Sequence, residues 1–291
     1  MKQITISIVT PTYNQAQFIS QTIESVLSQE GDFLIDYIIV NDGSTDNTLE
    51  IIKKYDSMLK SGSWPLKCKG ISYRYWTRKN GGQTGAINEG LRMATGEVLA
   101  WMNSDDYYMP GIFEKIARVF ANDPELDFLY GDSLKIYEDG RPPKTEPRPR
   151  PDETFESLRD RGNSFGFNFF SKKIVERVGY LDESLQYAVD LDLWLKMFRI
   201  GKVRYLPITF GAYRMWAGSK TATQQKKFAE ERKLIAERYG GNIVSAHTLY
   251  RWRGKFAAVL DVLQKKTPSF YEACKRTLYS AIDRLKYTTK I

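Results

Sequence analysis

The order of strand-like and helical segments constrains this fold more than any other feature of the sequence. Short β-rich runs alternate with segments of helical periodicity over the first 121 residues. The β-rich runs cover residues 4–10, 37–40, 71–76 and 98–102, and the helical segments cover 18–29, 45–59, 83–94 and 111–121. A strand followed by a helix and another strand forms a crossover unit with parallel strands. The pattern therefore predicts an α/β fold with a mostly parallel central sheet and helices on both faces.

The fourth β-rich run ends in a strongly polar segment. Its apolar residues lead directly into Asn103, Ser104, Asp105 and Asp106, and Pro110 closes the segment. A short apolar run between turn formers is typical of a buried strand, and carboxylates near a core require a partner. In open α/β sheets, ligands bind outside the carboxyl ends of the strands. The segment therefore indicates a site for a cation, alone or with a phosphate. A surface turn is the alternative, because Asn, Ser and Asp are common turn residues.

Two other predicted strands also end in polar loops. These loops, at residues 11–14 and 41–46, are expected to meet the carboxylate segment at one edge of the sheet. Asp42 could accept a hydrogen bond from a base N–H or only cap its own turn, and Tyr13 could stack on a base or only pack. No Gly-rich phosphate loop follows the first strand, which argues against dinucleotide and P-loop sites. A nucleoside diphosphate would then need Mg²⁺ or Mn²⁺, for which the two adjacent carboxylates are suitable ligands.

The second half of the chain has a less regular pattern. Strand-like runs are expected at residues 128–130, 165–170, 203–206 and 208–213, with a short helix between Ser171 and Gly179. Asp190 or Asp192 opens a further helix, and the apolar spacing that follows, including Trp194, indicates core packing. Residues 141–151 contain five prolines and four basic residues, which is typical of a stiff loop that serves as a mobile flap or a connector.

The C-terminal quarter carries the basic character of the protein. The net charge is +8, and from Lys220 onward there are 16 basic and 6 acidic residues, against 27 and 29 in the rest of the chain. Three helices are predicted there, at about 224–239, 243–264 and 268–286. The last two mix apolar and aromatic residues with Lys and Arg, as amphipathic helices on membrane surfaces or partner helices do. A solvated basic face on packed helices is the alternative.

Composition argues against several other functions. His247 is the only histidine, and Cys68 and Cys274 are far apart, so His-based zinc sites, Ser-His-Asp catalysis and thiol redox motifs are not expected. No apolar run of about 18 residues occurs and no signal peptide is recognisable, so a cytoplasmic protein is expected. The basic tail lacks a recognisable nucleic-acid module, and we expect no nucleic-acid partner.

Several segments together resemble the nucleotide-sugar glycosyltransferase family 2, whose members have the GT-A fold. They are Ser7–Asn14, Ile39–Thr48, Asn80–Gly82 with Asn88, Asn103–Asp106 with Pro110, Gly179–Leu185 and Asp190–Leu195. The resemblance covers roughly residues 3–220, and the combination is specific although each segment alone is weak. It implies a GT-A domain at residues 1–220 and a basic amphipathic helical extension at 221–291. Within the domain, a donor half is expected at about 1–110 and an acceptor half at about 111–220.

The resemblance also implies roles for individual residues. Asp42 would bind the donor base, and Asp105, within the segment that matches the family's Asp-x-Asp motif, would bind the metal on the diphosphate. Asp190 falls on the family's catalytic base, and Asp192 would fix the start of its helix. The expected metal is Mn²⁺ or Mg²⁺. We predict nucleotide contacts at Pro11, Thr12, Tyr13, Asn14, Asp42, Asn80 and Ser104, metal ligands at Asp105, Asp106 and Asn103, and diphosphate contacts at Arg214 and Lys220.

Three positions depart from the family pattern. Asn103 replaces the first Asp of the metal motif, and Val189 replaces the usual acid beside the base. Trp216 stands where related sequences usually carry a His that can ligate the metal or contact the diphosphate. Because an indole cannot ligate a metal, the metal is expected to be weakly held.

The function implied by the resemblance is inverting transfer of a sugar from a nucleotide-diphosphate donor, UDP- or dTDP-linked. The acceptor would be a hydroxyl of a glycan or of a lipid-linked molecule, in the synthesis of a bacterial surface polysaccharide or glycoconjugate. The C-terminal helices would then contact an anionic membrane, at the inner face of the plasma membrane, and homodimer formation stays open.

Two other functions remain to be compared with this one. A non-catalytic sugar-nucleotide-binding or assembly subunit with a decayed metal site is the main alternative, as Val189 and Trp216 would suggest. A nucleotidyltransferase is disfavoured, because residues 11–14 are not the Gly-rich basic loop that such enzymes normally need after the first strand.

Overall fold

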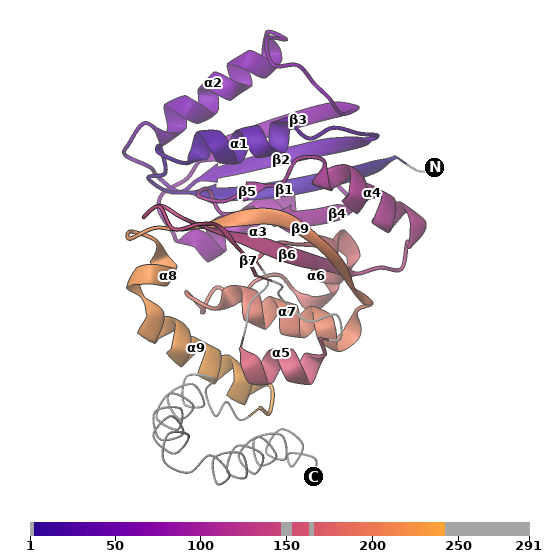
Figure 1. The fold of residues 1–291 in the computed structure, drawn as a ribbon, viewed down its shortest axis with the longest axis vertical. Helices are drawn as coiled ribbons and strands as arrows, with labels where there is room; N and C mark the ends of the chain where they lie inside the picture. The colour runs from indigo at the N-terminus through magenta and orange to yellow at the C-terminus, as the bar shows by residue number, and fades with distance from the viewer. Residues whose placement is uncertain (1–2, 147–152, 163–165, 242–291) are drawn as a thin grey trace, which may run out of the picture. The chain divides into compact units, whose positions relative to one another are not determined.

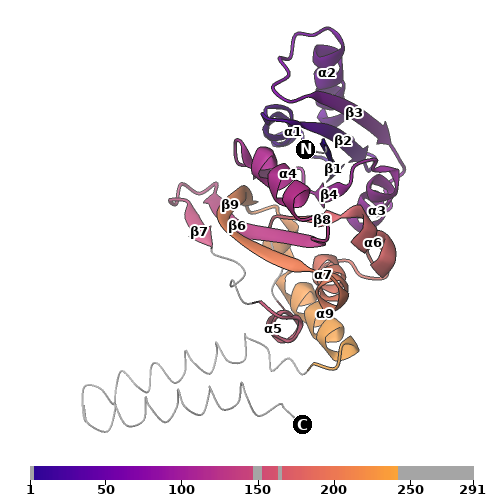
Figure 2. The same cartoon turned by 90° about the vertical axis from the view of Figure 1, so that its right-hand side faces the viewer.

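A computed structural model describes residues 3–146, 153–162 and 166–241 (Figures 1 and 2). The described strands form one sheet in the order β3-β2-β1-β4-β8-β6-β9-β5, and β7 pairs with β6 at the side. The strands are β1 (Ile4–Thr12), β2 (Phe33–Asn41), β3 (Gly70–Thr77), β4 (Val98–Trp101), β5 (Tyr107–Tyr108), β6 (Phe128–Tyr137), β7 (Lys144–Glu146), β8 (Asn168–Ser171) and β9 (Val203–Met215). The helices are α1 (Ile19–Leu27), α2 (Thr48–Lys60), α3 (Gln83–Met93), α4 (Ile112–Asn122), α5 (Phe155–Arg161), α6 (Lys172–Val178), α7 (Val189–Ile200), α8 (Lys220–Thr223) and α9 (Gln225–Arg238).

The first half of the sheet has the parallel arrangement that the sequence predicts. β1 pairs in parallel with both β2 and β4, and β2 pairs in parallel with β3. Beyond β4 the sheet is mixed, because β8 runs antiparallel to β4 and β6, whereas β6 and β9 are parallel. Antiparallel neighbours need no crossover helix, which is why the second half lacks the regular strand–helix alternation of the first. The predicted α/β class is therefore confirmed, with a mixed sheet.

Helices cover both faces of the sheet, and each face has its own core. Ile6 and Ile8 of β1 belong to the core formed with α1, α2 and α4, whereas Val9 belongs to the core formed with α3, α6 and α7. In Figure 2, α1 and α4 lie on one side of the sheet and α3 and α6 on the other. Successive side chains of a strand point to opposite faces of the sheet. Because β1 is apolar at consecutive positions, it contributes side chains to both cores.

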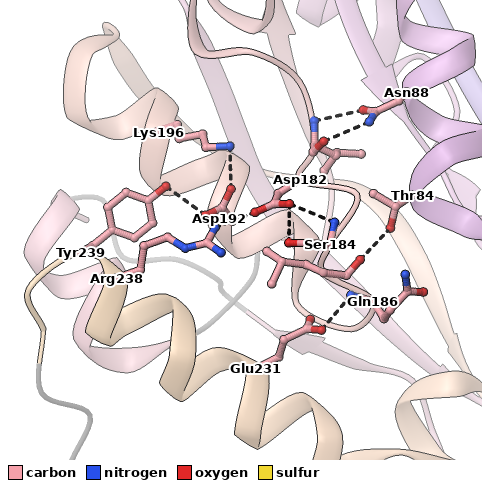
Figure 3. Close-up of polar contacts among 12 residues, drawn as sticks. Thr84, Asn88, Asp182, Ser184, Gln186, Asp192, Lys196, Glu231, Arg238 and Tyr239 are labelled. Carbon is pink, nitrogen blue, oxygen red and sulfur yellow. Dashed lines mark hydrogen bonds and ion pairs between the residues drawn. The ribbon is translucent and has the colours of Figure 1, made fainter.

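The close packing of α3 on β1 depends on a glycine. A Cβ at Gly90 would lie 2.4 Å from Cγ1 of Val9, well inside van der Waals contact, so only a residue without a side chain allows this approach. On the same helix, the buried Asn88 donates to the Leu181 carbonyl and accepts from the Leu181 N–H, both at 3.0 Å (Figure 3). Helix α3 thereby joins the first half of the sheet to the segment that precedes α7.

A buried ion pair, not expected from the sequence, joins the first strands. Asp36 of β2 is 1% exposed and accepts hydrogen bonds from Ser7 Oγ at 2.8 Å and from the N–H and hydroxyl of Thr95 at 2.9 Å. Arg74 of β3 donates to its other oxygen at 2.6 Å. A buried carboxylate needs partners of this kind, and these contacts tie β1, β2 and β3 to the residues that lead into β4.

The second half differs from the sequence-based predictions in several places. One continuous strand, β9, replaces the two predicted at 203–206 and 208–213, and β7 lies within the proline-rich segment. The sequence does not predict the seven-residue α5, nor the two-residue β5, which has too few residues for a periodic pattern. Residues 147–151 lie outside the described residues, so the flap or connector predicted there stays a prediction.

Helix α9 packs against α7 through polar contacts to a buried carboxylate (Figure 3). Asp192 of α7 is fully buried, accepts hydrogen bonds from Arg238 Nη1 and Tyr239 Oη at 3.0 Å, and pairs with Lys196 at 2.7 Å. The compact unit that contains these residues ends at Gly241. The other two predicted C-terminal helices lie outside the described residues, and the predicted division of the chain at residue 220 remains a prediction. Among the described helices, none has the length and apolar content needed to span a lipid bilayer.

Asp182 is expected to make part of the stability pH-dependent. Hydrogen bonds from Ser184 and from the Arg238 guanidinium lower the pKa of Asp182 to about 2, against an ordinary 3.8. A depressed carboxyl pKa stabilises the fold above the unfolded-state value, and this effect is lost as the pH falls through the folded-state value. We expect Asp182→Asn to lower the free energy of unfolding by roughly 2 kcal/mol at neutral pH. At about pH 3 the loss of free energy should be only half as large.

Urea unfolding of wild type and Asp182→Asn at the two pH values measures this effect. Glu237→Gln is a matched control, because Glu237 is an exposed partner of Lys233 at 3.7 Å and should change the stability by less than about 0.5 kcal/mol. A difference between wild type and Asp182→Asn that is the same at both pH values would contradict the linkage.

Candidate functional site

The polar strand ends open into a cavity of about 670 Å³. Its walls come from the carboxyl ends of β1 and β4, from the start of α7, and from the end of β9 and the segment that follows. The predicted site residues in its lining are Pro11, Thr12, Tyr13, Asp42, Asn80, Asn103, Ser104, Asp105, Asp106, Asp190, Arg214 and Lys220. Asn14 is the predicted residue that the lining lacks. The polar loops therefore meet at the carboxyl edge of the sheet, as the strand order predicts.

Asn14 joins two loops to each other. Its backbone has a left-handed φ of 51°, its N–H donates to Ser44 Oγ at 2.9 Å, and its side-chain oxygen accepts from the Thr45 N–H at 2.8 Å. Asn tolerates this backbone conformation better than most residues. The loop after β1 is thereby held against the loop after β2, which supports the cavity wall from behind.

Asp42 binds the backbone of the loop before α3. Its buried carboxylate accepts hydrogen bonds from the N–H of Gly81 at 3.1 Å and of Gly82 at 2.9 Å, and Arg78 pairs with it at 3.1 Å. Gly82 has a φ of 92°, a backbone conformation that favours glycine. Asp42 therefore holds a neighbouring loop and not only its own turn. Asn80 lies in this loop and contributes to the cavity wall.

Several buried polar atoms of the cavity lining have no hydrogen-bond partner among the described residues. They are Thr12 Oγ1, Gln15 Oε1, Ser133 Oγ and Trp194 Nε1. A buried polar group without a partner costs about 1–3 kcal/mol, and buried water commonly satisfies such groups. The sequence analysis did not identify Gln15, Ser133 and Trp194 as lining residues. Gln15 directly follows the polar loop at residues 11–14, whereas no sequence signal places Ser133 beside the strand ends.

Trp194 both packs in the core and lines the cavity. Its ring stacks on Trp101, with 4.7 Å between the centroids and 18° between the planes, and its side chain is 1% exposed. The sequence predicts only this packing. Trp194 follows Asp190 by four residues, a spacing that puts the two side chains on the same face of α7. That spacing was the available signal for its second role.

Asp105 and Asp106 form a pair of adjacent carboxylates in the cavity lining. Asp105 accepts a hydrogen bond from the Trp216 indole at 2.9 Å, and Asp106 accepts one from the Arg214 N–H at 2.9 Å. Burial raises the pKa of both carboxyl groups, and the charge of Asp105 raises the pKa of Asp106 further. Two like charges held close together in a partly buried site attract a cation.

Trp216 contacts the carboxylate pair from the segment after β9. Its ring packs against Phe18 with 5.2 Å between the centroids, and a Cβ at Gly218 would lie 2.2 Å from the indole ring. The indole N–H engages Oδ2 of Asp105. Trp216 therefore orients Asp105, although it cannot take the ligand role of the His that the family resemblance led us to look for.

The two predicted diphosphate residues line the cavity, but both have protein partners. Arg214 Nε donates to the Asp105 carbonyl at 3.1 Å, and its guanidinium pairs with Glu138 at 3.2 Å. Lys220 donates to the Gln186 carbonyl, and desolvation lowers its pKa. Arg214 therefore supports the backbone at Asp105, and Lys220 supports the segment before α7.

Asp190 lies in the first turn of α7 and lines the cavity. Its Oδ1 accepts a hydrogen bond from the Leu191 N–H at 2.9 Å. The helix begins at Val189, so both Asp190 and Asp192 are in its first turn. Asp192 is buried against α9, whereas Asp190 reaches the cavity. One residue can therefore act on a ligand while the other fastens the helix.

The carboxylate pair suits a metal only if a ligand completes the coordination. Within the described ranges, no three His, Cys, Asp or Glu side chains are grouped so that they could hold a metal ion. Asn103 lies beside the pair, with its Nδ2 3.5 Å from Asp106 Oδ2. Mg²⁺ is commonly bound by one or two carboxylates together with substrate phosphates and water. The residues present fit a cation that binds together with a diphosphate.

Known proteins share this sequence pattern. The family model described as glycosyl transferase family 2 matches residues 7–180, which is more than half of the chain. Chondroitin synthase of Pasteurella multocida (strain Pm70) is 30% identical over 201 residues, which are 69% of this chain and 20% of that protein. Hyaluronan synthase of Pasteurella multocida is also 30% identical over 201 residues, which are 69% of this chain and 19% of that protein. The chain thus spans about one fifth of the length of these relatives.

Solved structures share the fold. S. aureus TarS 1–349 in complex with UDP-GlcNAc has a TM-score of 0.61 and 23% identity, over 84% of this chain and 69% of that chain. The mannosyltransferase PcManGT from Pyrobaculum calidifontis, in complex with GDP-Man and Mn²⁺, has a TM-score of 0.56 and 15% identity, over 82% of this chain and 65% of that chain. The fold is therefore that of the GT-A glycosyltransferases. The chain belongs to glycosyl transferase family 2.

Proposed function

We propose that this protein transfers a sugar from a nucleoside-diphosphate donor, UDP- or dTDP-linked, to an acceptor hydroxyl with inversion at the anomeric carbon. The observation that supports this most is that a carboxylate pair and a separate carboxylate, Asp190, line the same cavity. Inverting displacement uses both, because one site must stabilise the leaving diphosphate and a base must activate the acceptor.

The donor half, at about residues 1–110, would hold the nucleotide. Tyr13 is 47% exposed at the end of β1, so its ring is available to stack on a base, with Pro11 and Thr12 beside it. Asp42 would shape this pocket by holding the Asn80 loop, and a carboxylate oxygen has lone pairs left to accept a base N–H as well. The complex of TarS with UDP-GlcNAc supports a uridine nucleotide as the first donor to test.

A divalent cation, Mn²⁺ or Mg²⁺, would be held by Asp105, with Asp106 and Asn103 beside it. When bound, it would offset the negative charge that develops on the leaving diphosphate. Trp216 would keep the Asp105 carboxylate in place, and Arg214 would hold the backbone of the same turn. The complex of PcManGT with Mn²⁺ supports Mn²⁺ as the ion to test first.

Asp190 would accept the proton of the acceptor hydroxyl as its oxygen attacks the anomeric carbon. Asp190 lies in the first turn of α7, at the positive end of the helix dipole. The acceptor half, at about residues 111–220, would position the acceptor, and Ser133 and Trp194 belong to the cavity lining there. Lys220 remains a candidate for a phosphate contact at this end.

The acceptor is proposed to be a glycan or a lipid-linked glycan in bacterial surface polysaccharide or glycoconjugate synthesis. The excess of basic residues after Lys220 supports contact with an anionic membrane surface. Sedimentation of the whole chain with lipid vesicles tests the proposed membrane contact. The protein should sediment with anionic vesicles and not with neutral vesicles. Equal binding to both kinds of vesicle, or to neither, would oppose it.

A thermal-shift screen of sugar nucleotides with Mn²⁺ tests donor binding. A donor at 100 times its dissociation constant is expected to raise the free energy of unfolding by about 2.7 kcal/mol. UDP- and dTDP-sugars should stabilise the protein more than the free sugars do. Stabilisation by no sugar nucleotide would contradict the proposal. The alternative of a non-catalytic binding subunit, which Trp216 favours, predicts the same stabilisation without transfer, so the activity measurements below are needed to separate the two.

A further inference from the structure

Glu231 of α9 binds the backbone just before α7. Its carboxylate accepts hydrogen bonds from the N–H groups of three consecutive residues, Gln186, Tyr187 and Ala188, each at 2.7 Å. Figure 3 shows Glu231 reaching from α9 to the segment at Gln186. The next residue in the chain begins α7, and Asp190 lies in its first turn. A side chain more than 40 residues away therefore holds the entry to this helix.

This contact binds the N-cap of α7 and the two residues before it from another helix. Ala188 is the N-cap of α7, and its side chain makes no capping hydrogen bond. The first N–H groups of a helix lack partners within the helix, and a carboxylate at that end interacts favourably with the helix dipole. Hydrogen bonds to a charged acceptor are also roughly twice as strong as neutral ones. Glu231 thus binds one of these groups, the N–H of Ala188, together with the two N–H groups that precede it.

Two further contacts fix the same region. Lys220 donates to the Gln186 carbonyl, and its Nζ lies 5.0 Å from the centroid of the Tyr187 ring. Farther along, the buried Asp192 accepts hydrogen bonds from Arg238 and Tyr239 at the end of α9, both at 3.0 Å. Helix α9 and its C-cap therefore hold the chain at Ala188 and again at Asp192, two residues before and two residues after Asp190.

We propose that Glu231 is a positioning residue for sugar transfer, which fixes the Asp190 carboxylate relative to the acceptor hydroxyl by binding the N–H groups that precede α7. The inference rests on the proposed function, in which Asp190 is the base. A misplacement of about 1 Å in a reacting group can lower a rate about 10²-fold. Loss of these three hydrogen bonds from residues 186–188 to Glu231 should therefore lower kcat, while the donor pocket at the ends of β1 and β4 stays intact.

The variants Glu231→Ala, Glu231→Gln and Glu230→Ala test this in the whole chain. Glu231→Ala is expected to lower kcat of transfer by about 10- to 100-fold, with the donor dissociation constant within about twofold of wild type. Glu231→Gln should lie between, because its amide oxygen still accepts hydrogen bonds. Glu230→Ala is the matched control and should behave as wild type, since Glu230 is exposed and pairs with Lys226 at 3.8 Å.

Amide hydrogen exchange gives a readout that does not depend on activity. Peptides that cover residues 185–191 should exchange faster in Glu231→Ala than in wild type or Glu230→Ala. Unchanged amide exchange of these peptides in Glu231→Ala would show that Glu231 does not hold the segment before α7. A kcat of Glu231→Ala close to wild type, or a donor affinity that falls as much as kcat, would overturn the positioning role. A wild type that binds no sugar nucleotide and transfers no sugar overturns the proposed function, an outcome that is distinct from these.

Discussion

Asp190→Asn is expected to lower the rate of sugar transfer by about 10²- to 10⁴-fold while donor binding stays intact. The amide keeps the shape of the carboxylate and can still accept from the Leu191 N–H, but it cannot take up the proton of an acceptor hydroxyl. Asp190 is the carboxylate of α7 that reaches the cavity, whereas Asp192 is buried against α9. The measurement is kcat of transfer together with the donor dissociation constant from calorimetry.

Asp139→Asn is a suitable control for the same change of side chain. Asp139 is exposed and pairs with Arg141 at 2.7 Å, at a distance in sequence from every predicted site residue. The control should transfer sugar at the wild-type rate. Asp190→Asn with nearly wild-type kcat would remove Asp190 from the role of base. A matching loss of donor affinity would mean that Asp190 serves the donor pocket.

The second large effect is expected at Asp105. Asp105→Asn should lower transfer by about 10²- to 10³-fold, the size commonly lost when one group that stabilises developing negative charge is removed. It should also abolish the extra stabilisation that Mn²⁺ gives to the donor complex. Transfer at several Mn²⁺ concentrations and in EDTA, with thermal shifts of the donor complex under the same conditions, measures both effects.

Trp216→Phe tests how far the carboxylate depends on its orientation. An aromatic ring that can pack on Phe18 remains, although it is smaller, and the N–H that donates to Asp105 is removed. A smaller loss than in Asp105→Asn is expected, together with a changed Mn²⁺ requirement. Full transfer by wild type in EDTA, or by Asp105→Asn in Mn²⁺, would contradict the metal role of Asp105.

The first half of the fold could be predicted because its sequence signals are local. Each parallel strand of this half is followed by a helix with its own apolar period. Polar residues such as Asp42 and Asp105 mark the ends of the strands directly in the sequence. The second half could not be predicted in the same way. The antiparallel placement of β8 and the continuous β9 depend on pairing with distant strands, and β5 has only two residues.

The site was predictable as a set of loops but not as a set of contacts. Asp42 was a candidate from the sequence, but its bonds to Gly81 and Gly82 depend on how two loops meet. Trp194 has the spacing of a core residue, and its place in the cavity lining depends on how α7 packs against the sheet. Glu231 lies on a helix that the family pattern does not reach, so no motif connects it with α7.

The most direct test of the central claim follows the fate of the donor. The whole chain is incubated with the sugar nucleotide that stabilises it best, with Mn²⁺ and a glycan acceptor, and the released nucleoside diphosphate and glycosylated product are measured beside Asp190→Asn. We expect release of nucleoside diphosphate matched by glycosylated product of inverted configuration for wild type, and neither for the variant. A wild type that binds the donor but neither transfers nor hydrolyses the sugar would contradict this account and favour a non-catalytic binding subunit.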